Sequence, residues 1–165
     1  MKLYAGERGL QAVDTGLTHD IIACAIEVHR QLGPGLLESA YEESLCYEFS
    51  CSGLAHKRQV PLSVRYREKY LDCGYRIDIV VDSRLVVEIK AVERLLPVHD
   101  AQILTYLKLS GLHLGLLINF NTILLHKGIR RLVHGTPPAE VPKGPSDAPA
   151  RHLSAAKRAG AQLLW

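Results

Sequence analysis

Apolar residues recur at helical spacing in two segments near the start of the chain. The first helix is predicted by residues three or four positions apart: Ile21, Ala25, Val28 and Leu32. Thr18 can cap this helix, and the sequence GPG at 33–35 is expected to end it. A second helix is predicted over residues 37–52, with Gly53 just beyond its end. Its apolar face consists of Leu37, Tyr41, Leu45 and Phe49.

The middle of the chain changes to patterns typical of strands. Apolar and polar residues alternate over residues 60–65, which predicts a half-exposed strand. Residues 70–81 and 85–91 predict two more strands, separated by the turn at 82–84. The three strands together are expected to form an antiparallel meander.

A helix and a buried strand follow. Pro97 is well placed to open the helix, and Gly111 is expected to end it. Residues 114–120 predict a buried strand, and residues 122–133 predict either a strand or a short helix. The expected fold class is therefore α/β, with a central mixed four-stranded sheet flanked by helices in the order α-α-β-β-β-α-β.

The composition supports one folded domain. The chain has 165 residues, of which 47% are hydrophobic and 22% are charged, as in an ordinary globular protein. We expect residues 1–16 to be a lead-in and residues 17–134 to be the folded domain. Residues 135–165 begin with a segment rich in Pro, Gly and Ser, which predicts a flexible linker followed by a basic tail.

Several functional classes are disfavoured by the same sequence. No apolar run reaches the ~18 residues that cross a bilayer, and the first residues lack the apolar core of a signal peptide, so we expect a cytoplasmic protein with no membrane partner. The cysteines show no CxxC pairing and are expected to be reduced structural thiols: Cys24, Cys46, Cys51 and Cys73. The net charge of +3 permits nucleic-acid binding without indicating it.

Charged residues in the predicted strands suggest a catalytic site. Glu88 and Lys90 lie two positions apart and so share one face of their strand. With a three-residue turn at 82–84, Asp78 falls opposite Glu88, whereas a two-residue turn would pair Ile77 with Glu88. Two facing carboxylates repel each other unless a cation joins them, and oxygen ligands suit Mg²⁺ or Mn²⁺. The other interpretation is an ordinary solvated strand face.

Two helical pairs could extend this site. Glu38 and Tyr41 lie three positions apart in the first turn of the second helix. Gln102 and Tyr106 lie four positions apart on the later helix and can point toward the same partner. The alternative roles are a stabilised helix start for the first pair and an ordinary helix surface for the second. We expect His29 and His99 to be capping, packing or surface residues.

Four segments, in this order, resemble the GxxExxY protein family, which is similar to a branch of the PD-(D/E)XK nucleases. They are GPGLLESAYEESL, LDCGYRIDIVV, VVEIKAVERLLPVHDAQILTYLKLSG and LGLLINFN. The resemblance implies a restriction-endonuclease-like core. It also implies these metal ligands: Glu38, Asp78, Glu88 and the backbone carbonyl of Ile89. Lys90 would be the catalytic lysine, and Gln102 and Tyr106 match a QxxxY element. Ile77 replaces the proline that names the superfamily.

The function implied by the resemblance is Mg²⁺- or Mn²⁺-dependent hydrolysis of nucleic acid, with DNA favoured. Residues 57–84 hold seven basic and four acidic residues, a modest excess that suits phosphate contact or a solubilising edge. We expect the contacts at Lys57, Arg58 and Arg76, and supporting roles for Tyr41 and Tyr106. A non-catalytic nucleic-acid or protein binding module on the same fold is the alternative, and a homodimer is left open.

Overall fold

The computed structural model describes residues 15–71 and 74–135. The expectations for residues 1–14 and 136–165 lie outside this range. The helices are α1 (Thr15–Leu32), α2 (Glu38–Cys51), α3 (Pro97–Ser110) and the 3-10 turn η2 (Leu125–Gly128). The strands are β1 (His56–Pro61), β2 (Val64–Tyr66), β3 (Lys69–Leu71), β4 (Arg76–Val81), β5 (Leu85–Lys90), β6 (Leu114–Asn119) and β7 (Ile129–Val133). None of the helices in this part of the chain is long and apolar enough to span a bilayer.

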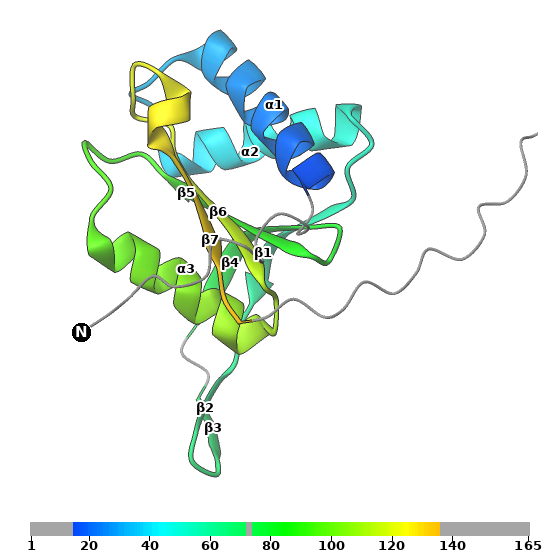
Figure 1. The fold of residues 1–165 in the computed structure, drawn as a ribbon, viewed down its shortest axis with the longest axis vertical. Helices are drawn as coiled ribbons and strands as arrows, with labels where there is room; N and C mark the ends of the chain where they lie inside the picture. Colours follow the sequence, from blue (N-terminus) through cyan, green and yellow to red (C-terminus); the bar gives the residue numbers. More distant parts are fainter. Residues whose placement is uncertain (1–14, 72–73, 136–165) are drawn as a thin grey trace, which may run out of the picture.

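The main sheet has five strands in the order β1-β4-β5-β6-β7 (Figure 1). β5 and β6 are parallel, and the other neighbours are antiparallel. Parallel neighbours need a crossover connection, which α3 provides. All six residues of β6 are buried, as expected for a strand covered on both faces.

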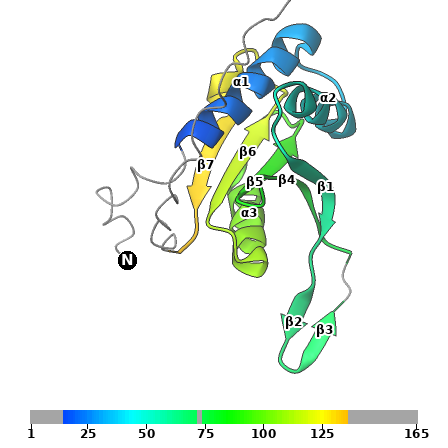
Figure 2. The same ribbon diagram turned by 90° about the vertical axis from the view of Figure 1, so that its right-hand side faces the viewer.

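Helices cover both faces of this sheet (Figures 1 and 2). α1 and α2 lie on one face, where Phe49 and Leu45 belong to the same buried cluster as Val87 and Ile89 of β5. α3 lies on the other face, where its buried apolar residues contact Val86 of β5. The alternation along β5 therefore divides its side chains between two layers, which confirms the expected α/β class.

The β4–β5 turn settles the register that the site depends on. Val81 pairs with Leu85 and Ile79 pairs with Val87, so the turn comprises three residues, 82–84. Asp82 and Ser83 adopt φ values of 52° and 56°, which allow this tight reversal. The prediction of a three-residue turn is confirmed.

Two predicted strands are each divided in the structure. Residues 60–65 are split between β1 and β2, and residues 70–81 between β3 and β4. The split begins at Leu62, which is buried and donates its backbone N–H to the carbonyl of Tyr75 at 2.8 Å. This bond closes the base of a β2–β3 hairpin that projects from the body in both views (Figures 1 and 2).

Other details differ from the expected boundaries. The predicted sheet of four strands was wrong, because residues 129–133 form β7 along the free edge of β6. Thr18 does not cap α1, because the helix begins at Thr15 and buries Thr18 within it. Gly111 does end α3, in the left-handed conformation with φ 73°.

Candidate active site

Asp78 and Glu88 lie on neighbouring strands at the same level of the sheet. Extending the β4–β5 register by one position places them opposite each other. Asp78 is half-buried, and its Oδ2 accepts the backbone N–H of Ile89 at 2.9 Å. The side chain of Asp78 is therefore held against the edge of β5 beside Glu88.

Glu88 is almost fully buried, with 2% of its surface exposed. Its Oε1 accepts a hydrogen bond from Lys90 Nζ at 2.6 Å, an ion pair whose lysine side chain is also mostly buried. Its Oε2 has no hydrogen-bond partner in the described part of the chain. A buried polar atom without a partner costs about 1–3 kcal/mol, so this oxygen is where an additional ligand would be favoured.

Burial and neighbouring charges change the protonation of these groups. Burial, followed by the charge of Asp78, raises the pKa of Glu88 to about 7. Burial also raises the pKa of Asp78. Burial works against the charge on Lys90, yet its hydrogen bond to Glu88 and the nearby carboxylates together raise its pKa. Lys90 is therefore a cation at neutral pH, next to carboxylates that resist ionising together.

Helix α2 brings a third carboxylate to the same end of the sheet. Glu38 Oε1 accepts the backbone N–H of Ala91 at 3.1 Å, directly after β5. The charge of Glu38 contributes to raising the pKa of both Asp78 and Glu88. Glu38 thus lies where its electrostatic field reaches both strand carboxylates.

Tyr41 supports this arrangement from a distance. Its hydroxyl donates to the carbonyl of Gly33 at 2.7 Å and accepts the N–H of Leu36 at 3.1 Å. Its ring stacks on Phe120 with centroids 4.5 Å apart. These contacts fix the loop before α2, so Tyr41 positions the helix start that carries Glu38.

Helix α3 supplies the polar pair predicted from its spacing. Gln102 Nε2 donates to the hydroxyl of Tyr106 at 3.0 Å. Burial raises the pKa of Tyr106, and the charges of Glu88 and Asp78 add to this effect. The pair therefore lies beside the carboxylates. His99 caps the start of α3 through its Nδ1, which accepts the N–H of Leu96 at 3.1 Å.

Glu42 was missed by the sequence analysis. It is buried, and its two carboxylate oxygens accept hydrogen bonds from Arg58 Nε and Gln59 Nε2, each at 2.9 Å. Its charge contributes to raising the pKa of Asp78. The signal was present, because Glu42 lies one helical turn after Glu38 and so shares its side of α2.

Asn119 was also missed as a positioning residue. It is fully buried at the end of β6, where it pairs with Lys90 in the parallel register. Its side chain accepts the N–H of Val92 at 3.0 Å and donates to the carbonyl of Val92 at 2.8 Å. Gly128 packs so closely here that a Cβ would lie 2.4 Å from the backbone oxygen of Asn119. This cluster holds the segment that follows β5.

The three predicted phosphate contacts differ in their surroundings. Lys57 and Arg76 are exposed on β1 and β4. The guanidinium of Arg58 is engaged by Glu42 and Glu43, and this pairing raises its pKa. Arg58 is therefore part of the support for Glu42, whereas the cations of Lys57 and Arg76 face solvent.

The carboxylates do not converge as a preformed metal cage. Within residues 15–71 and 74–135, no three Asp, Glu, His or Cys side chains meet at metal-ligand geometry. Asp78 and Glu38 each bind a backbone N–H, and Glu88 binds Lys90. The donors are nevertheless hard oxygens, and Oε2 of Glu88 lacks a partner. In their chemistry the residues therefore fit a hard divalent cation, although their side chains would have to reorient to converge on it.

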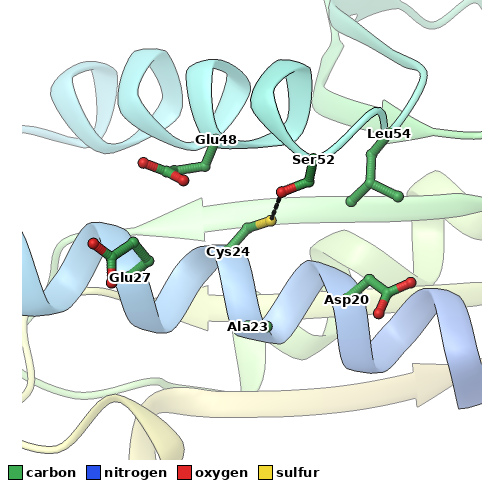
Figure 3. A pocket seen from close by; sticks show the side chains of 7 residues that line it. All are labelled: Asp20, Ala23, Cys24, Glu27, Glu48, Ser52 and Leu54. Atoms are coloured by element: carbon green, nitrogen blue, oxygen red, sulfur yellow. Dashed lines mark hydrogen bonds between the residues drawn. The ribbon is translucent and has the colours of Figure 1, made fainter.

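A separate pocket of about 440 Å³ lies between α1 and α2 (Figure 3). Its cysteine, Cys24, contacts Ser52 with Sγ and Oγ 3.4 Å apart. Burial raises the pKa of the Cys24 thiol, and acidic side chains surround it: Asp20, Glu27 and Glu48. A thiol that resists ionisation is a poor nucleophile. The raised pKa therefore gives no support to Cys24 as a nucleophile, and the candidate site remains the group of residues on β4, β5 and α3.

Comparison with curated proteins and with solved structures found no match. Residues 15–132 match the family model described as PD-(D/E)XK nuclease superfamily. The five-stranded mixed sheet flanked by helices is consistent with the fold of that superfamily. The match covers more than half of the chain, and the protein belongs to the PD-(D/E)XK nuclease superfamily.

Proposed function

We propose that this protein hydrolyses phosphodiester bonds of nucleic acid with Mg²⁺ or Mn²⁺, and that DNA is the favoured substrate. The observation that carries the proposal is the buried carboxylate of Glu88, which has one oxygen without a partner and lies opposite Asp78. Such a group is costly to the fold. A cation bound between the two carboxylates would offset that cost and would explain why both are present.

The ligand set would come from both strands and from α2. Asp78, Glu88 and the carbonyl of Ile89 would hold the cation, with Glu38 completing the set from the helix. A divalent cation supplies Lewis acidity and neutralises charge on a phosphoryl group. The support for Glu38 in this role is its bond to the N–H of Ala91, which places its carboxylate at the end of β5.

Lys90 would act as a fixed positive charge. Its raised pKa argues against a role as general base, because it would have to lose its proton near neutral pH. A buried ammonium is well suited to stabilising negative charge that develops on a phosphate. Gln102 would orient the substrate or Lys90 from α3, with Tyr106 holding its amide in place.

A binding module without catalysis is the competing function. Its support is that Asp78 and Glu38 already bind backbone N–H groups and need no cation to be satisfied. The buried pair of Glu88 and Asp78 favours catalysis, because a surface that binds phosphate has no need of two repelling carboxylates behind it.

The test is Mn²⁺-dependent cleavage of single-stranded, double-stranded and branched DNA and RNA. Wild type is compared with Asp78→Asn and Lys90→Ala, and Asp82→Asn serves as the matched control because it removes an exposed carboxylate from the next turn. We expect activity in wild type and the control and a loss of at least about 100-fold in the two site variants. Equal activity in all four proteins would indicate a contaminant. Inactive wild type that binds no Mn²⁺ would favour the binding module.

A further inference from the structure

The β2–β3 hairpin stands apart from the sheet that carries the site. β2 and β3 form a separate two-stranded sheet, with Arg65 paired to Tyr70 and Tyr66 paired to Lys69. Both views show it projecting into solvent (Figures 1 and 2). An isolated two-stranded ribbon is marginally stable in water. Packing alone therefore does not account for this projecting hairpin, which points to a role in binding.

Each face of the hairpin presents an exposed tyrosine beside an arginine. The guanidinium carbon of Arg65 lies 5.9 Å from the ring centroid of Tyr70, and that of Arg67 lies 5.5 Å from the ring centroid of Tyr66. Tyr66 is 61% exposed and Tyr70 is 70% exposed. Large aromatic groups left in solvent next to cations are typical of surfaces that stack on bases and bind phosphates.

The tip of the hairpin holds a cation at some cost in backbone energy. Arg67 is the first residue of the two-residue turn and has φ 54°, a conformation that favours glycine or asparagine. Arg65 Nε donates to the carbonyl of Arg67 at 2.9 Å and stabilises this turn. Arg67 therefore presents an exposed cation at the tip of the hairpin.

The base of the hairpin leads to the catalytic end of the sheet. β3 is followed by β4, whose third residue is Asp78. Tyr75, which is 50% exposed, packs edge-on against Tyr106 of α3 with centroids 6.5 Å apart. Tyr106 belongs to the same buried cluster as Val86 of β5, the strand that carries Glu88 and Lys90. Tyr70 is eight residues before Asp78, at most about 28 Å away along an extended chain.

We propose that the β2–β3 hairpin is an arm that binds single-stranded nucleic acid and directs it toward Asp78, Glu88 and Lys90. Unpaired bases stack on Tyr66 and Tyr70, and the phosphates contact the cationic side chains of the arm. Residues 64–71 contain three basic residues and one acidic residue, so their charge complements phosphate. The delivery of the strand to the carboxylates rests on the proposed function, whereas binding by the arm does not.

A single strand fits these features better than a duplex. The faces of bases are covered in a duplex, so exposed rings gain little from it, whereas every unpaired base offers a face for stacking. A ribbon that reads the major groove would present polar side chains to base edges. Here each face of the hairpin carries an exposed tyrosine, Tyr66 beside the turn and Tyr70 in the middle pair.

The experiment measures binding of the full chain in EDTA, so that cleavage cannot interfere. The probes are a fluorescent oligodeoxynucleotide of about 20 residues, longer than a typical single-strand site, the same sequence as RNA, and the matching DNA duplex. The variants are the double change Tyr66→Ala with Tyr70→Ala, the corresponding double change to Phe, and Arg67→Gly. Tyr47→Ala is the control, because Tyr47 is equally exposed (68%) but lies on α2.

We expect the double change to Ala to weaken single-strand binding about tenfold or more and duplex binding less than about threefold. The double change to Phe and Tyr47→Ala should bind as wild type does. Arg67→Gly should weaken both forms and reduce the salt dependence by the equivalent of about one phosphate contact, without lowering the midpoint of thermal unfolding.

Single-strand binding within about twofold of wild type after the double change to Ala would overturn the proposal. So would equal losses for both DNA forms, or a wild type that binds no probe. Failure of the proposed nuclease has a different result, because Mn²⁺-dependent cleavage would then be absent while tyrosine-dependent binding in EDTA persisted. Where cleavage occurs, the double change to Ala should raise KM for single strands and leave kcat unchanged.

Discussion

Both faces of β5 are largely buried, but one is apolar and the other carries charges. Toward α1 and α2 it presents Val87 and Ile89, which join an apolar cluster around Phe49. Toward α3 its last two side chains are Glu88 and Lys90, an ion pair in which one carboxylate oxygen of Glu88 has no hydrogen-bond partner. One strand therefore contributes both to the part of the core that stabilises the fold and to the part that costs stability.

Under the proposed function, this difference separates residues that stabilise the fold from residues that carry out the chemistry. Apolar burial stabilises a domain in proportion to the area removed from water. A buried carboxylate near a second one does the reverse unless it is neutralised. Substitutions on the two faces should consequently move the free energy of unfolding in opposite directions, and only one face should control catalysis.

The largest effect is expected on the apolar side. Phe49→Ala removes a fully buried ring and should lower the free energy of unfolding by about 3–5 kcal/mol, measured by urea denaturation. Tyr47→Ala on the same helix is the control and should change it by less than about 0.5 kcal/mol. The folded fraction of Phe49→Ala should keep its kcat. A loss of kcat in the folded protein would contradict the view that the apolar face contributes to stability alone.

The opposite sign is expected for Glu88→Gln. The pKa of Glu88 in the folded protein is about 7, above its ordinary value of 4.5, so the free energy of unfolding falls as pH rises between these values. Gln keeps an acceptor for Lys90 without the charge, so at about pH 8 without metal it should be more stable than wild type by up to about 3 kcal/mol. Activity should be abolished. A less stable variant would contradict this view of Glu88.

The same carboxylate should make metal binding depend on pH. Mn²⁺ must displace a proton from Glu88 below about pH 7, because burial and the neighbouring Asp78 favour the neutral acid. We expect the stabilisation by Mn²⁺ to decrease by about 1.4 kcal/mol for each pH unit below 7. Thermal unfolding at a fixed Mn²⁺ concentration between about pH 5.5 and 8 measures it. A shift independent of pH would exclude Glu88 as a ligand.

The smallest effect concerns the support behind the site. Tyr41→Phe removes the hydroxyl that binds Gly33 and Leu36 but leaves the stacking on Phe120. The free energy of unfolding should decrease by about 1 kcal/mol. Because the loop before α2 is then held less rigidly, cleavage should decline several-fold while Mn²⁺ still binds. Unchanged cleavage would show that Glu38 does not depend on this loop.

Much of this arrangement follows from local sequence. The glycines that end α1 and α3 act within a few positions, so the helices were predictable. The Asp78–Glu88 register depends on whether the turn has two or three residues, and the structure selects three. The pattern of residues 122–133 is compatible with either a strand or a helix, and the outcome depends on pairing with β6. Local patterns cannot decide such pairing.

Other features depend on contacts between distant residues. The sequence predicts two neighbouring antiparallel strands in this region, but not their division into a hairpin that is separate from the main sheet. That division depends on the break at Leu62, whose backbone N–H binds the carbonyl of Tyr75. The role of Asn119 depends on its pairing with Lys90 across parallel strands. The sequence likewise contains no sign that the guanidinium of Arg58 is engaged by Glu42, and its contact with nucleic acid stays a prediction.

Gly128 has a consequence for any survey of tolerated substitutions. A single methyl group there would collide with the backbone of Asn119, which cannot move aside as a flexible side chain could. We expect every replacement at this position to abolish function as completely as replacement of Glu88 does. Gly128 would then appear as intolerant as the carboxylates in a mutational scan. The two cases would differ in folding, because variants of Gly128 would fail to fold, whereas variants of Glu88 would fold and lack activity.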